Sequence, residues 1–183
     1  GTYNTFGGNL SASGADINQN KGFFWSVNSF YRKGDGYFVV AEQERDSLDA
    51  KTYLEETGAS FRVGYQFTAQ NSIEAEYNYY WDKRGDGTFI TEPGGSYNQY
   101  PSHFLRVKYQ GTLSRWQLNA NGFYQLENYR RQNETIRKQT GKYTLYETDS
   151  RRTDAGLWLT AALPMKNGSR LTTGIDAKAG KVE

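Results

Sequence analysis

Few side chains in this sequence could do covalent chemistry, and none stands in a catalytic arrangement. His103 is the only histidine, and Ser102 precedes it directly. A serine nucleophile needs its base within hydrogen-bond reach, whereas neighbouring residues of a strand point to opposite faces. The sequence has no cysteine, which removes disulfide scaffolds and thiolate metal sites. We therefore expect a protein that is not an enzyme and that carries no cofactor.

Two Gly-Asp-Gly stretches each follow a basic residue. They are Lys33-Gly34-Asp35-Gly36 and Arg84-Gly85-Asp86-Gly87, the second of which contains an Arg-Gly-Asp triplet. Glycine and aspartate favour turns, whereas a calcium loop would need further carboxylates at fixed spacing, and none follow. Both stretches are therefore predicted to be turns.

Side chains suited to binding fall into two groups. The first consists of charges at alternate positions that are predicted to face a lumen: Arg62, Glu74, Glu76, Arg106 and Lys108. They could contact a permeant molecule or a plug, although a cross-strand ion-pair ladder is the simpler interpretation. The second group is predicted to lie in long loops and consists of the ligand-contact candidates Tyr97, Tyr100, Tyr129, Arg130 and Arg131, with Tyr143 and Tyr146. Arginine suits anionic ligands and tyrosine gives broad amphipathic contact, but tyrosine is also a common interfacial residue.

The elements that must position these groups are β-strands. Between Ile73 and Trp81 the odd positions are apolar or aromatic, while Glu74, Glu76 and Asn78 occupy even positions. Alternation of this kind predicts a strand with one apolar and one polar face. The same pattern recurs to give eight predicted strands, around residues 6–12, 23–32, 59–67, 73–81, 105–110, 116–126, 157–163 and 170–179. Trp158 is an exception, an aromatic on a polar side.

Composition and the spacing of the strands point to a membrane. Hydrophobic residues make up 36% of the 183 residues, aromatics 16%, and the mean hydropathy is −0.86. The net charge of +2 gives no sign of a nucleic-acid partner. Short connections are expected near residues 16–22, 68–71, 112–115 and 164–169, and long ones near 38–56, 85–103 and 133–152. Outer-membrane barrels alternate short periplasmic turns with long extracellular loops.

The parity of these connections predicts where the chain ends lie. The first and last connections are both short, so both ends should lie at the edge that carries the long loops. Complete single-chain barrels have both ends in the periplasm, and the sequence has no initiator methionine or signal peptide. We therefore expect an all-β fold, an antiparallel transmembrane β-barrel segment of eight strands from a larger barrel. Its first and last strands should not pair with each other.

Several stretches resemble TonB-dependent outer-membrane receptors. They are Gly1-Thr2-Tyr3 with Phe6 and Leu10–Gly14, Phe23–Asn28 running on to Tyr31–Tyr37, and Thr173-Gly174-Ile175-Asp176. The resemblance would make residues 1–183 a partial receptor barrel, about strands 2 to 9 of 22, with the plug domain and the remaining strands outside it.

The resemblance implies active uptake of a scarce nutrient, usually a ferric siderophore, across the outer membrane of a Gram-negative bacterium. The implied partners are outer-membrane lipid, the small-molecule ligand, and the TonB complex acting through the plug. A passive porin-class channel would share the two faces and the loop parity and remains the alternative. An outer-membrane enzyme and a soluble β domain are further alternatives; the first lacks a His-centred group of residues.

Overall fold

The computed structural model describes residues 4–137, 139–166 and 168–183, and these form an all-β fold. The strands are β1 (Thr5–Asn18), β2 (Lys21–Gly34), β3 (Tyr53–Thr68), β4 (Asn71–Gly85), β5 (Tyr97–Leu113), β6 (Trp116–Arg137), β7 (Lys142–Pro164) and β8 (Arg170–Val182). A single turn of 3₁₀ helix, η1 (Glu42–Glu44), lies in the β2–β3 connection. The prediction of an antiparallel eight-stranded β fold is confirmed.

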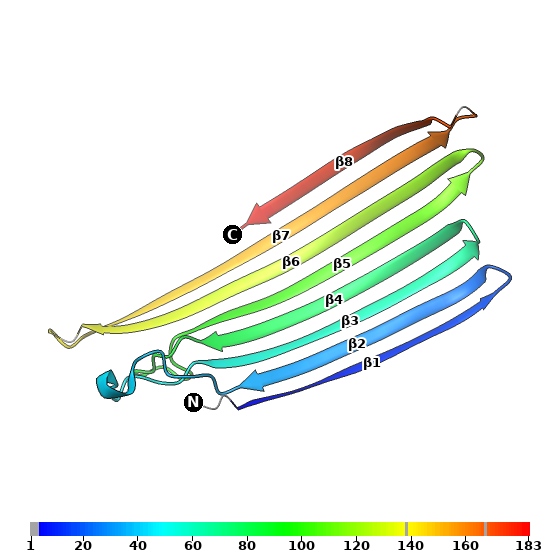
Figure 1. Ribbon diagram of the computed structural model, residues 1–183. Coiled ribbons are helices and arrows are strands. Elements are labelled where there is room, and N and C mark those ends of the chain that lie inside the picture. Colours follow the sequence, from blue (N-terminus) through cyan, green and yellow to red (C-terminus); the bar gives the residue numbers. More distant parts are fainter. Residues whose placement is uncertain (1–3, 138, 167) are drawn as a thin grey trace.

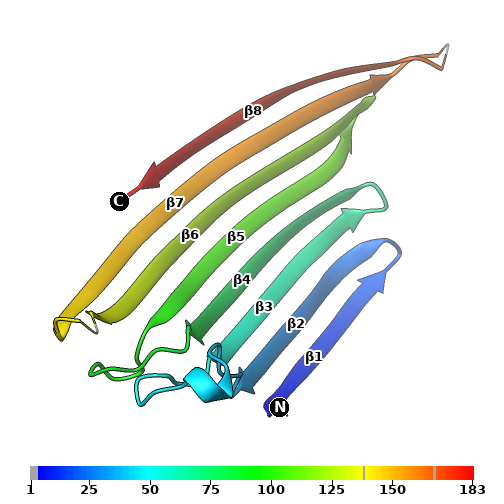
Figure 2. The ribbon, with the colours of Figure 1, turned by 60° about the vertical axis from the view of Figure 1, so that its left-hand side comes forward.

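The strands form one sheet in sequence order, and each pairs antiparallel with the next (Figure 1). Short turns gather at one edge of the sheet, and the long connections gather at the other, which we call the rim (Figures 1 and 2). The described chain begins at the start of β1 and ends at the end of β8 on the rim side, as the loop parity predicts. Among the described residues β1 and β8 do not pair with each other, so the sheet is an open wall.

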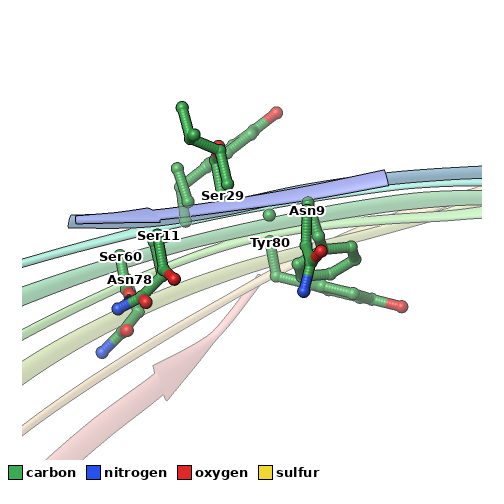
Figure 3. A pocket seen from close by; sticks show the side chains of 12 residues that line it. Asn9, Ser11, Ser29, Ser60, Asn78 and Tyr80 are labelled. Carbon is green, nitrogen blue, oxygen red and sulfur yellow. Dashed lines mark hydrogen bonds between the residues drawn. The ribbon is translucent and has the colours of Figure 1, made fainter. Parts of the chain in front are cut away.

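Alternation of side chains gives the wall two chemically different faces. Ile73 and Ala75 lie opposite Tyr109 and Val107 on the face that we call apolar. The opposite, polar face carries the glutamates and amides of the same strands. Figure 3 shows the separation near β1: Ser29 projects to one side of the sheet, and Asn9, Ser11, Asn78 and Tyr80 project to the other.

The wall has almost no hydrophobic core of its own. In the described part of the chain, Tyr97 and Ala162 are the buried hydrophobic residues. Large side chains of the apolar face stay exposed, including Phe61 at 46%, Leu105 at 45% and Leu157 at 43%. Backbone pairing therefore holds the sheet together, and the apolar face has no partner within the described chain.

Aromatic rings on the polar face lie over glycines. A Cβ added at Gly156 would come within 2.2 Å of the Phe123 ring, and the same holds for Gly64 under Phe24. Phe123 also stacks on Trp158, with ring centroids 5.0 Å apart. The predicted exception, Trp158 on a polar side, is therefore explained by aromatic packing along the wall.

Three of the short connections, at residues 19–20, 69–70 and 114–115, are tight two-residue turns. Gln19 and Asn20, with φ of 48° and 65°, join β1 to β2 in the left-handed conformation that two-residue hairpins favour. Gly36 and Gly87 also have positive φ, at 62° and 95°, just beyond the ends of β2 and β4. The predicted turns are not formed at either Gly-Asp-Gly stretch, because Gly34 and Gly85 are the last residues of β2 and β4 and the chain leaves both strands without a regular turn.

Of the three predicted long loops, one is shifted, one is shorter and one is wrong. The β2–β3 connection covers residues 35–52 rather than 38–56, because both strands end or begin earlier than expected. The β4–β5 connection covers only residues 86–96, because β5 begins earlier than the sequence pattern indicated. The predicted loop at 133–152 is instead a continuous hairpin in which β6 and β7 stay paired to Arg137 and Lys142. Ile136 opposite Tyr143, and the positive φ of Gly141, show that alternation and turn chemistry continue there.

Candidate ligand-binding rim and polar face

Four charged residues form an ion-pair chain halfway up the polar face. Arg62 lies opposite Glu76, which in turn lies opposite Arg106. The closest contacts are Arg62 with Glu74 and Arg106 with Glu76, and a longer contact of 3.8 Å joins Arg106 to Glu74. Lys108 lies opposite Glu74 in the ladder. The predicted ladder therefore exists, with Arg62 bonded diagonally to Glu74 rather than straight across.

Nearer the rim, arginines stand over buried carboxylates. Arg84 Nε lies 2.6 Å from Asp82 and Arg152 Nε lies 2.7 Å from Asp154. The arginine side chains are more than half exposed, whereas those of Asp82 and Asp154 are 9% and 7% exposed. A solute that approaches this part of the face therefore meets guanidinium groups before it meets carboxylates.

The five ligand-contact candidates lie in β5 and β6 rather than in the predicted long loops, and they divide between the two faces of the sheet. Tyr100, Tyr129 and Arg131 fall on the polar face, because Tyr100 is opposite Asp82 and Arg131 is opposite Asn98. Tyr97 and Arg130 fall on the other face.

On that other face both residues already have partners. Tyr97 is buried under Lys83, whose ammonium lies 3.9 Å from the centre of the ring. Arg130 forms a 3.7 Å ion pair with Glu147. The arrangement therefore brings together three of the five predicted residues and separates the other two from them.

Glu134, which sequence reasoning missed, anchors the rim. The residue is 2% exposed, and its carboxylate accepts hydrogen bonds from the backbone N–H groups of Ile90, Thr91 and Glu92 at 2.9–3.0 Å. The Thr91 and Tyr143 hydroxyls donate to the same carboxylate, each at 3.1 Å. Burial alone would raise the pKa of Glu134, but these donors lower it to about 2.

The rim loops are also bonded to one another. Phe89 N donates to Leu48 O at 3.0 Å, which joins the 86–96 connection to the 35–52 connection. Gln132 donates to Gly95 O at 2.9 Å, and the backbone N–H of Glu134 donates to the Ser96 hydroxyl at 2.8 Å. Hydrogen bonds therefore join the connections at the rim to each other and to β6, so the connections are not independent loops.

His103 lies among tyrosine side chains on the apolar face. Its Nδ1 lies 2.7 Å from the Tyr77 hydroxyl on the apolar face, and Tyr79 packs beside the ring. Ser102 lies opposite Tyr80 on the polar face, so the two residues do point apart. Residues 4–137, 139–166 and 168–183 contain no group of three or more acidic or histidine side chains that could hold a metal ion.

The described residues include no helix with the length and apolar character needed to cross a membrane. No family model, curated protein or solved structure matches this chain. A polar face of paired charges that rises to a braced rim of Arg, Tyr and Asn side chains is suited to guiding and binding a small polar solute.

Proposed function

We propose that this chain forms part of the wall of a larger outer-membrane β-barrel, a receptor of the TonB-dependent type that imports a scarce nutrient such as a ferric siderophore. The observation that carries the proposal is a sheet with one apolar face, one charged face and almost no core. Exposed apolar surface on this scale is unfavourable in water at about 25 cal/mol per Å². Lipid removes that cost on one face, while a hydrated lumen solvates the charges on the other.

The apolar band has a height that suits an outer membrane. From Ile73 to Trp81 the chain rises roughly 27 Å at about 3.4 Å per residue. A strand tilt of about 40° reduces this to ~21 Å, near the ~25 Å apolar band of outer-membrane barrels. Tyr77, Tyr79 and Trp81 occupy the rim side of this stretch, where such proteins carry aromatic girdles.

The open edges of the sheet favour a wide barrel. The outer edges of β1 and β8 are unpaired among the described residues. In hydrocarbon each unpaired backbone group costs several kcal/mol, so these edges need further strands as partners. A wall of eight strands within a larger barrel meets that requirement.

Lipid exposure can be tested on two adjacent residues of β4. Ala75→Cys should react with a lipid-soluble maleimide in native membranes, whereas Glu74→Cys should react with a water-soluble one. The two positions are neighbours on one strand, so the variants differ mainly in the face of the sheet to which the cysteine points. Reaction of both with the water-soluble reagent alone would argue for a soluble β domain and against the proposal.

The transport mode needs a separate measurement. A TonB-dependent receptor uses the proton-motive force, so a protonophore should abolish uptake of its ligand by cells. Ligand binding to those cells should persist, because the rim site does not need the energy source. Uptake that continues unchanged, in proportion to the external concentration, would favour the passive porin-class channel.

A further inference from the structure

A row of nitrogen donors crosses the polar face at the rim. Arg84 lies opposite Asn98, and Asn98 lies opposite Arg131, so the three side chains stand side by side on β4, β5 and β6. The Tyr129 hydroxyl donates to Asn98 Oδ1 at 2.8 Å. Because the amide oxygen is engaged, the Nδ2 end of Asn98 remains as a hydrogen-bond donor between the two guanidinium groups.

The acidic groups near this row leave much of its donor capacity available. Asp82 engages Arg84 through Nε, and Tyr80 also bonds to this guanidinium, which carries five N–H donors in all. Asp86 is exposed as a whole residue, but partial desolvation of its carboxylate raises its pKa, and the positive charge of Arg131 partly offsets this rise, which places Asp86 within electrostatic reach of Arg131. Asp82 is buried beneath the row, whereas Asp86 is exposed beside it.

We propose that Arg84, Asn98 and Arg131 form a binding site for an oxyanion, a carboxylate or phosphate group carried by the solute that enters at the rim. Two guanidinium forks that flank an amide donor match the planar or tetrahedral oxygens of such a group. The inference deepens the proposed receptor function by giving the class of ligand group at its entrance. The bracing of the rim by Glu134 holds the strands that carry Asn98 and Arg131 in place.

The sequence supplies a matched control for this site. Arg130 is adjacent to Arg131 and is also exposed, but it lies on the opposite face and pairs with Glu147. The experiment measures the binding of inorganic phosphate, with sulfate and citrate as second probes, to the intact protein in detergent micelles at a constant ionic strength of about 0.15 M, where the Debye length is about 8 Å. Titration calorimetry compares the wild type with R131Q, R130Q, N98L and D86N.

We expect R131Q and N98L to raise the Kd for phosphate about tenfold, since each removes a donor to a charged group. R130Q should leave the Kd within about twofold, because exposed charges on the far face are screened. D86N should lower the Kd, because it removes a competing carboxylate.

Three results would overturn the proposal: no saturable binding of any of the three anions by the wild type, equal effects of R130Q and R131Q, or no effect of N98L. R84Q is only a supplementary variant, because removal of the Arg84 charge leaves the buried Asp82 without its ion-pair partner. The other variants test the anion site without it. Labelling of cysteines placed at positions 74 and 75 tests the proposed membrane wall independently of anion binding. Failure of the proposed function and failure of the anion site therefore give different results.

Discussion

Glu134 illustrates how one buried carboxylate can organise a surface. Three consecutive backbone N–H groups, from Ile90 to Glu92, converge on it, and two hydroxyls complete its shell. Buried ionised groups are tolerated when they are fully hydrogen-bonded, and unpaired N–H groups are costly. The loop and the carboxylate therefore each satisfy the other's polar groups.

Glu134→Gln should release the 86–96 connection while leaving the sheet intact. The amide keeps the shape of the side chain but loses the charge and points N–H groups toward N–H donors. Bonds to charged groups contribute about 1.5–3 kcal/mol each, so the free energy of local opening should fall by at least that amount. Hydrogen exchange at Ile90, Thr91 and Glu92 should accelerate, whereas Glu147→Gln, at an exposed position, should change it little. Unchanged exchange in Glu134→Gln would contradict the bracing role.

The same carboxylate makes the rim sensitive to acid. The pKa of Glu134 is about 2 in the folded rim and 4.5 as an ordinary glutamate, so the folded form binds fewer protons. Its stabilising contribution is therefore complete above about pH 5 and is lost as the pH falls toward 2. Exchange at Thr91, corrected for the intrinsic pH dependence, should rise over that window in the wild type. Glu134→Gln should lack this rise, and a rise of equal size in the variant would point to another group.

At the scale of elements, each strand has two chemically different faces, and most neighbouring strands are joined by short hairpins. β6 and β7 carry an additional constraint, since Phe123 lies over Gly156 and between Phe104 and Trp158. The ring cannot move away from the glycine without disturbing two aromatic contacts. Close packing of this kind makes small additions of volume costly.

Gly156→Ala should therefore destabilise the β6–β7 pair by about 1–3 kcal/mol. The added Cβ would lie 2.2 Å from the Phe123 ring. Gly122→Ala on β6 is the control, since the nearest atoms to its added Cβ lie 3.9 Å away. Urea unfolding of the intact protein in micelles compares the two variants. Equal stabilities would show that the ring adapts without strain.

At the scale of the whole molecule, the central feature is that the wall stays open. The eight strands are ordered β1 to β8 with no ladder between the first and the last in the described chain (Figure 2). Both edges therefore offer backbone donors and acceptors to further strands. The wall is expected to act as an arc of a wide barrel rather than as a narrow closed one.

Paired cysteines can test this arrangement in the intact protein. Ser11→Cys with Asn28→Cys should form a disulfide, because these residues are direct partners on β1 and β2. Ser11→Cys with Asp176→Cys should form none, because disulfides need Cα atoms within about 7 Å. Mass spectrometry after mild oxidation gives the yields. Efficient linkage of β1 to β8 would indicate a closed eight-stranded barrel and remove the case for a large receptor.

The sequence by itself determined the strands, their two faces and their neighbours. Side-chain alternation has a period of two that any window of a strand displays, and short turns force adjacent strands to pair. Those two facts are enough to place Arg62 opposite Glu76. Glu76 and Arg106, in contrast, lie on strands joined by the long 86–96 connection, and they face each other through the register of the assembled sheet. However, the polar residues beyond Leu126 resemble a loop, so the sequence pattern did not show that β6 continues through Arg130 and Arg131. Because adjacent strand residues point to opposite faces, that continuation places Arg130 and Arg131 on different faces.

Only the tertiary structure decided which residues meet at the rim. Glu134 contacts residues more than forty positions away, and no local pattern marks a carboxylate that will receive three backbone donors. The row of Arg84, Asn98 and Arg131 likewise depends on the registers of two successive hairpins and on where the loop between them ends. How far a residue lies from the short turns depends on the register of every strand pair that precedes it. That position is therefore a property of the assembled sheet rather than of any single segment.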